Sequence, residues 1–190
     1  YAVGFLQSQN ERTANREPRE VADSPSGTRV VHFQEYWIRM RAEVPAETVV
    51  VVGLDRAAPA PGVVEAITGA DLVLVPPSNP VVSVGTILGV PGVRDALVGT
   101  DAPVVGLSPV VEGQHVRGMA RQLLTAIGVE VSAARSQGGV LDGWLVDTGD
   151  AGDLAALEAA GLRAAAVPLM MTSPEATAAM VAAAVDLVAR

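Results

Sequence analysis

The sequence contains no cysteine, and only 3% of its 190 residues are aromatic. The absence of thiols excludes a disulfide framework and a thiolate metal site. Hydrophobic residues nevertheless make up 49% of the chain, so Val, Leu, Ile and Ala must build the core. The chain is long enough for one domain with a sizeable core.

Long uninterrupted apolar runs are also missing, although the mean hydropathy is positive at +0.35. Gly, Pro and Asp interrupt the apolar segments before any of them is long enough to span a membrane. No secretory signal is visible at the start of the sequence. We therefore expect a soluble, cytoplasmic protein that makes no contact with a membrane.

Basic residues are scarce, since 13 Lys and Arg stand against 21 Asp and Glu, for a formal net charge of −8. An acidic surface repels a phosphate backbone, so we expect no nucleic acid as a partner. A single nucleotide remains possible, because local dipoles can hold it. The common metalloprotease, hydrolase, Walker and dinucleotide motifs are all absent.

Short apolar runs alternate with helical patterns along most of the chain. The pattern predicts strands at 49–52, 72–75, 102–107, 143–146 and 164–169, and a further one within 28–41. It predicts helices at 61–68, 93–98, 115–127, 154–160 and from 174 to the end, where Ser173 is the expected cap. The expected packing face of this last helix is Thr177, Met180, Val181, Ala184 and Val188. The alternation indicates an α/β fold, a Rossmann-like three-layer sandwich with a mostly parallel sheet, over residues 29–190, and residues 1–28 are an arm or linker.

The stretch 71–88, DLVLVPPSNPVVSVGTIL, joins a buried strand to a helix through a polar turn. Ser78 and Asn79 follow the expected carboxyl end of the strand, and Ser83 is the expected helix cap. Ligands of open parallel sheets bind at that edge, and a helix N-terminus favours phosphate. The pattern favours an anion or nucleotide site at Ser78, Asn79 and Ser83. The alternative is a plain connection between a strand and a helix.

Two further groups of charged residues are candidates. Arg117 stands near the expected start of the helix at 115–127, where it either faces an anionic ligand or is solvated. We expect Asp142, Asp147, Asp150 and Asp153 to cluster at an end of the strand at 143–146. They could bind a cation, but a solvated acidic loop is the interpretation we favour.

Several segments in order resemble the CofD/FbiA family. They are HFQEYWIR, ADLVLVPPSNPVVSVGTILGVPGVRDAL, GLSP with HVRGMA, LDGWLVDTGD, and VPLMMTSPEATAAMV, and they extend from about Val30 to the end. The family comprises the 2-phospho-L-lactate transferases, or phosphoenolpyruvate transferases in actinobacteria, of coenzyme F-420 biosynthesis. The resemblance implies a transferase that joins the deazaflavin alcohol Fo to a phospholactyl or phosphoenolpyruvyl group from a guanosine-diphosphate ester, with release of GMP.

The resemblance further implies a magnesium ion and a homodimer. It places Ser78, Asn79 and Ser83 at the guanosine-diphosphate side of the site. The glycine-rich loop and the metal-holding aspartates of the family's first strand have no counterpart here, and Arg121 replaces the usual Asp after R-G-M-A. We therefore expect no metal site in this chain, and a C-terminal portion of such an enzyme or a divergent member that does not turn over alone. The alternatives are a non-catalytic regulatory protein that binds nucleotide diphosphates and a structural fragment without a ligand.

Overall fold

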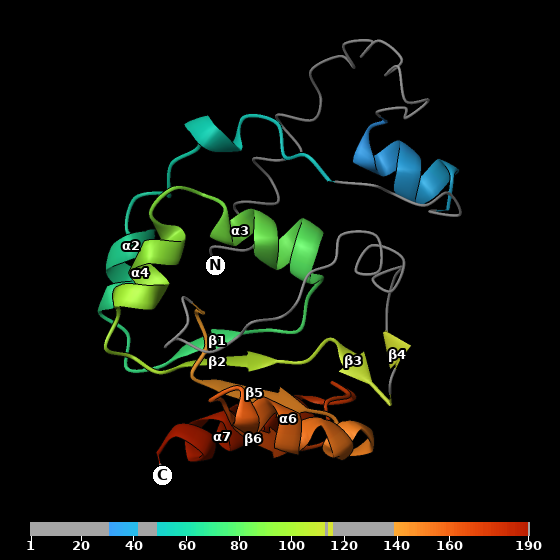
Figure 1. Ribbon diagram of the computed structural model, residues 1–190, viewed down its shortest axis with the longest axis vertical. Coiled ribbons are helices and arrows are strands. Elements are labelled where there is room, and N and C mark those ends of the chain that lie inside the picture. Colours follow the sequence, from blue (N-terminus) through green and yellow to red (C-terminus); the bar gives the residue numbers. More distant parts are fainter. Residues whose placement is uncertain (1–30, 42–48, 113, 116–138, 190) are drawn as a thin grey trace.

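A four-stranded parallel sheet forms the centre of the molecule. The computed structural model describes residues 31–41, 49–112, 114–115 and 139–189. Within them the strands lie in the order β1-β2-β5-β6, and each pairing is parallel (Figure 1). These strands are β1 (Val73–Val75), β2 (Val104–Leu107), β5 (Gly143–Val146) and β6 (Arg163–Ala166). A short antiparallel pair follows β2 and consists of β3 (Val110–Val111) and β4 (Gln114–His115).

Helical segments connect the strands as the sequence pattern predicts. They are η1 (Glu35–Arg39), η2 (Leu54–Arg56), α2 (Val63–Thr68), η3 (Pro80–Gly85), α3 (Thr86–Leu88), α4 (Val93–Gly99), η5 (Thr148–Asp153), α6 (Leu154–Ala159) and α7 (Pro174–Val188). Helices α2 and α6 lie within their predicted ranges, and α4 extends one residue beyond its own, to Gly99. The α/β class and the parallel sheet are thus confirmed.

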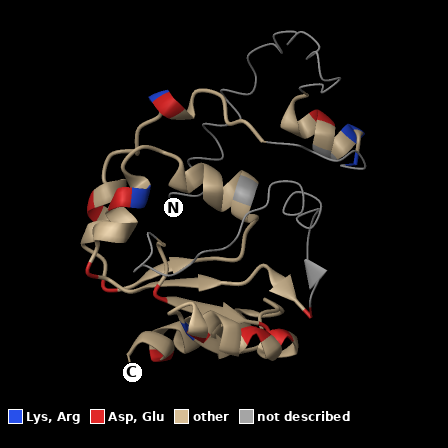
Figure 2. Cartoon of the chain, in the orientation of Figure 1, with Lys and Arg blue, Asp and Glu red and all other residues tan. Residues whose placement is uncertain are grey.

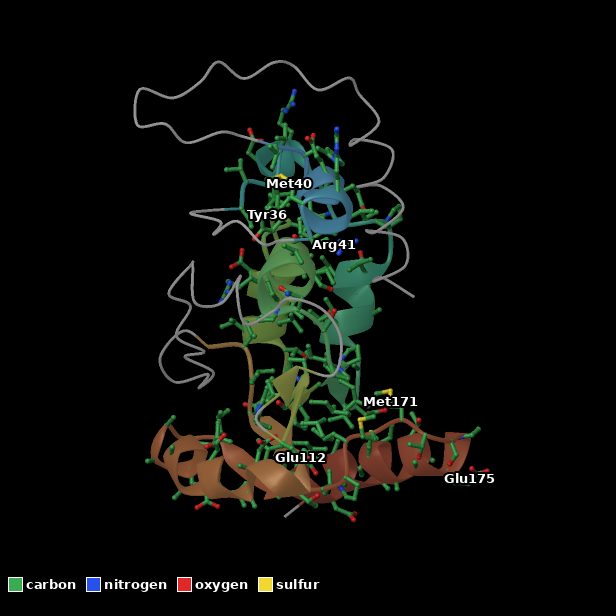
Figure 3. All side chains as sticks on the ribbon, turned by 90° about the vertical axis from the view of Figure 1, so that its right-hand side faces the viewer. Tyr36, Met40, Arg41, Glu112, Met171 and Glu175 are labelled. Carbon is green, nitrogen blue, oxygen red and sulfur yellow. The ribbon has the colours of Figure 1, made fainter. Side chains whose placement is uncertain are left out.

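Two hydrophobic clusters cover the two faces of the sheet. Val104 packs with residues of α4 on one face, and Val105 packs with Met180 and Ala184 of α7 on the other. Successive strand residues point to opposite faces, and both valines have no exposed surface. Leu157 of α6 belongs to the first cluster, so α6 and α7 lie on opposite sides of the sheet (Figure 3). The three-layer arrangement follows from this division.

Helix α7 begins as the sequence predicts but packs through a slightly different face. The Ser173 hydroxyl oxygen accepts a hydrogen bond from the Ala176 N–H at 3.1 Å, as an N-cap does. Met180 and Ala184 are buried, and Leu187 and Val188 pack beside them. Val181 was predicted on this face, but its side chain is 41% exposed. It stands one residue past Met180 and is therefore rotated about 100° away from the sheet.

The predicted strand within 28–41 is wrong. Residues 33–39 are helical. Within them η1 is a π-helix, in which the Met40 N–H donates to the Glu35 carbonyl oxygen, five residues back, at 3.0 Å. Phe33, Tyr36 and Met40 recur at helical spacing, and their packing outweighs the strand propensity of the aromatic residues. Residues 1–28 lie outside the described residues.

Two other strand predictions need correction. Residues 49–52 form no strand, and Val50 and Val52 are 73% and 80% exposed. No neighbouring strand is available to them among the described residues, so apolar character alone misled the prediction. The strand predicted at 164–169 is β6, which ends at Ala166; Pro168 cannot donate to a ladder.

Among the described residues, no single helix is long and apolar enough to span a membrane. The helical segments Val82–Leu88 and Val93–Gly99 would together be long and apolar enough, but the chain bends by 80° between them.

Candidate functional site

Ser78 and Asn79 lie just past the carboxyl end of β1, as the sequence predicts. Val75 pairs with Gly106 of β2, and Leu107 pairs with Leu145 of β5, so the carboxyl ends of these strands share one edge of the sheet. Pro76 and Pro77 end β1, and the chain then turns into η3. The polar turn therefore stands where ligands of open parallel sheets bind.

Asn79, and not Ser83, caps the helix that follows. The Asn79 side-chain oxygen Oδ1 accepts a hydrogen bond from the Val82 N–H at 3.0 Å. Its carbonyl oxygen accepts from the N–H groups of Ser83 and Val84, at 3.2 and 3.0 Å. The helix therefore starts at Pro80, four residues earlier than predicted. Asn followed by Pro is a favoured N-cap and first helical residue, and this pair was the stronger signal.

Ser83 still faces the turn, although it is not the cap. The hydroxyl oxygens of Ser78 and Ser83 share a hydrogen bond at 2.7 Å. Because this hydrogen bond uses only one of the two hydroxyl protons, the pair keeps one proton for another acceptor. Ser78, Asn79 and Ser83 are thus brought together, and a phosphate oxygen is an acceptor that suits them.

The helix after the turn has an uncommon geometry. The Val84 N–H reaches the carbonyl oxygen five residues back, which makes η3 a π-helix. The stretch from Pro80 to Leu88 contains no charged residue, so local dipoles dominate its start (Figure 2). Wide turns of this kind are rare and often lie at functional sites. Gly85 stands within a helical pattern, and this glycine could have indicated the irregular helix from the sequence.

Asp147 is a buried carboxylate at the same edge of the sheet, and the sequence did not single it out as a separate residue. It is 5% exposed and follows β5 directly. Its oxygens accept hydrogen bonds from the N–H groups of Gly149, at 3.0 Å, and Leu169, at 2.9 Å. These N–H donors hold the pKa of Asp147 below its ordinary value of 3.8, against the opposing effect of burial. Asp147 therefore fixes the two loops that follow β5 and β6.

The predicted group of four aspartates does not form. Asp142 precedes β5 and its Oδ2 accepts from the Val104 N–H at 2.8 Å, at the amino end of the sheet. Asp147 and Asp150 follow β5 at the carboxyl end. Strand β5 lies between Asp142 and the other two aspartates, so Asp142 is at the opposite edge of the sheet from Asp147 and Asp150. In the part of the chain that the structure describes, no three His, Asp or Glu side chains are grouped so that they could hold a metal ion.

Two sequence predictions concern residues 115–127. His115 lies in strand β4 and not in the predicted helix. Arg117 and the remainder of that helix lie outside the described residues. The proposed role of Arg117 at the nucleotide site therefore stays a prediction.

Comparison with known proteins places these features in a family. The family described as 2-phospho-L-lactate transferase CofD matches residues 14–181. The phosphoenolpyruvate transferase of Kitasatospora aureofaciens is 58% identical over 165 residues, which are 85% of this chain and 51% of that protein. The phosphoenolpyruvate transferases of Streptomyces griseus subsp. griseus and Streptomyces coelicolor are 54% and 56% identical over 90% and 92% of this chain, and 55% and 56% of their own length. The chain thus spans about half the length of these curated relatives, and it belongs to the CofD family.

Proposed function

We propose that the chain forms the nucleotide-binding part of a transferase in coenzyme F-420 biosynthesis. The transferred group is a phosphoenolpyruvyl group, or a phospholactyl group, and it moves from a guanosine-diphosphate ester to Fo. The names of the similar proteins from Kitasatospora and Streptomyces support the phosphoenolpyruvyl donor. One observation carries the proposal. Ser78, Asn79 and Ser83 lie together in one hydrogen-bonded turn at the carboxyl edge of the sheet, in a chain of this family.

The reaction exchanges one phosphorus–oxygen bond for another. The terminal ribityl hydroxyl oxygen of Fo attacks the phosphorus that carries the enolpyruvyl group, and the bond from this phosphorus to the GMP oxygen breaks. GMP leaves with the bonding pair, the hydroxyl proton passes to solvent, and nothing is oxidised or reduced. Catalysis of such a transfer consists mainly of positioning and charge neutralisation.

The described residues contribute to positioning. The Ser83 hydroxyl can donate to a phosphate oxygen, and the start of η3 supplies the positive end of the peptide dipoles. Asn79 keeps this start in place by capping it. The loop therefore holds the diphosphate of the donor while the acceptor approaches.

Magnesium and a second copy of the chain complete the proposal. A magnesium ion would supply charge neutralisation at the diphosphate. Among the described residues, no three His, Asp or Glu side chains are grouped so that they could hold it. We propose a homodimer and a cytoplasmic location as the setting of the reaction.

A transfer assay tests the proposal. We would join this chain to the residues that the Streptomyces coelicolor relative carries outside the matched segment, and incubate the product with Fo, the guanylylated enolpyruvyl phosphate and magnesium. Mass spectrometry should detect phosphoenolpyruvyl-Fo and GMP, whereas this chain alone should give neither. The Asn79→Asp variant should lose turnover, and Gln34→Ala, an exposed residue outside the loop, should keep it. Turnover that Asn79→Asp leaves unchanged would contradict the proposed site.

A further inference from the structure

We infer that Tyr36 is a positioning residue for the Asn79 loop and acts on it through Val82. The inference rests on the proposed function, because it concerns the same nucleotide site. Tyr36 is 7% exposed and packs against Val82 of η3. The N–H of Val82 is the group that donates to Oδ1 of Asn79 at 3.0 Å. One residue thus receives the tyrosine ring and supplies the hydrogen bond that fixes the Asn79 side chain.

The two segments that meet at this contact, η1 and η3, are both π-helices. In η1 the Met40 N–H reaches the Glu35 carbonyl, and in η3 the Val84 N–H reaches the Asn79 carbonyl, each five residues back. Such turns are rare in proteins and occur as short pieces, frequently at functional sites. A rare backbone geometry persists only where neighbouring groups hold it in place. The contact between Tyr36 and Val82 packs η1 and η3 against each other and so holds both. In Figure 3, Tyr36 and Met40 are labelled on η1.

The cluster around Tyr36 is separate from the sheet's own core. Its members are Val31, Phe33, Met40, Val49 and Val82, and none of them belongs to the clusters on the two faces of the sheet. A substitution at Tyr36 therefore acts on the turn at Asn79 and leaves the sheet packing in place. This separation distinguishes a positioning role from a general contribution to stability.

The test measures GDP affinity and unfolding in parallel on the full 190-residue chain. Tyr36→Leu keeps an apolar side chain but loses the ring, and Val82→Ala truncates the other side of the same contact. We expect each to weaken GDP binding about fivefold in calorimetry, the size of a coupling between residues in contact. The matched control is Met180→Ala, which removes a buried side chain of α7 and should lower stability without changing GDP affinity.

A double-mutant cycle tests whether Tyr36 acts through the cap. In the Asn79→Ala background, Tyr36→Leu should cause little further loss of GDP affinity, because the group that it positions is gone. Losses of GDP affinity that simply add in the double variant would overturn the inference. An unchanged GDP affinity in both Tyr36→Leu and Val82→Ala, with weak binding by Asn79→Ala, would overturn it as well. In that second case the proposed function stands. Failure of the unsubstituted chain to bind GDP would overturn both. If Tyr36→Leu does not fold, Val82→Ala, a smaller truncation, decides the question.

Discussion

A Cβ atom added to Gly85 would lie 2.7 Å from the carbonyl oxygen of Pro80. The wide turn from Pro80 to Gly85 places these two residues one above the other along the helix. Only glycine leaves room for the Pro80 carbonyl at this distance. The shape of the loop that contains Asn79 and Ser83 therefore depends on a residue without a side chain.

Replacement of Gly85 by alanine should disturb this turn. We expect Gly85→Ala to lower the free energy of unfolding by ~1–3 kcal/mol, the usual cost of overpacking, and to weaken GDP binding as the turn shifts. Urea unfolding and calorimetry measure the two effects. The control is Gly99→Ala in α4, where an added Cβ meets nothing within 4 Å. There alanine should leave stability unchanged or raise it by up to ~1 kcal/mol, since it favours the helix. Equal effects at the two glycines would contradict this explanation.

The capping role of Asn79 can be separated from its proposed role in ligand binding. Asn79→Asp keeps a cap oxygen for the Val82 N–H, so the free energy of unfolding should stay within about 0.5 kcal/mol of the original. The new negative charge should repel a diphosphate and weaken GDP binding about tenfold or more. Asn79→Ala should instead cost ~1 kcal/mol of stability, because the cap is lost. Tight GDP binding by Asn79→Asp would place the diphosphate elsewhere.

The ring of Trp144 occupies the space beside Gly106 on the neighbouring strand. A Cβ at Gly106 would collide with the Cζ3 and Cε3 atoms of the indole, and the two residues are register partners. Gly106→Ala should therefore lower the free energy of unfolding by ~1–3 kcal/mol. A smaller side chain in the Trp144→Leu background should reduce this loss, as measured by urea unfolding. An alanine that costs the same in both backgrounds would show that the ring is not the cause.

Asp147 should make stability depend on pH in the acid range. Its pKa is lowered in the folded state by N–H donors from Gly149 and Leu169, so the carboxylate stabilises the fold above the unfolded value near 4. This stabilisation is lost as the pH falls through the lower folded pKa. Asp147→Asn should cost ~1–3 kcal/mol at pH 7, because its NH₂ group cannot accept from both donors. The difference between the two proteins should shrink below pH 4 in unfolding experiments. A constant difference from pH 7 to pH 2 would exclude this role for the carboxylate.

The sequence predicted those parts of the fold that local pattern determines. Apolar runs ended by Pro, Ser or Asp gave the four strands of the sheet, and Ser173 with Pro174 gave the start of α7. The errors came where packing between distant segments decides the structure. The segment around Tyr36 is helical because Phe33, Tyr36 and Met40 pack together at helical spacing, and no local signal reveals the contact of Tyr36 with Val82.

The position of the polar turn after β1 was predicted correctly, but its capping residue was not. Ser78, Asn79 and Ser83 do come together, yet the cap is Asn79 because the hydrogen bond from Val82 decides it. The sequence could have indicated this through the Asn-Pro pair. It could not indicate that Asp142 and Asp147 lie at opposite edges of the sheet, which depends on where β5 begins and ends.

We propose that the loop from Ser78 to Ser83 binds the diphosphate of a guanosine nucleotide, and calorimetric titration of the 190-residue chain with GDP, and in parallel with guanosine, can show whether it does. GDP should bind at one site per chain, and guanosine, which lacks the diphosphate, should bind far more weakly. An absence of binding heat with GDP, or equal affinities for GDP and guanosine, would contradict it.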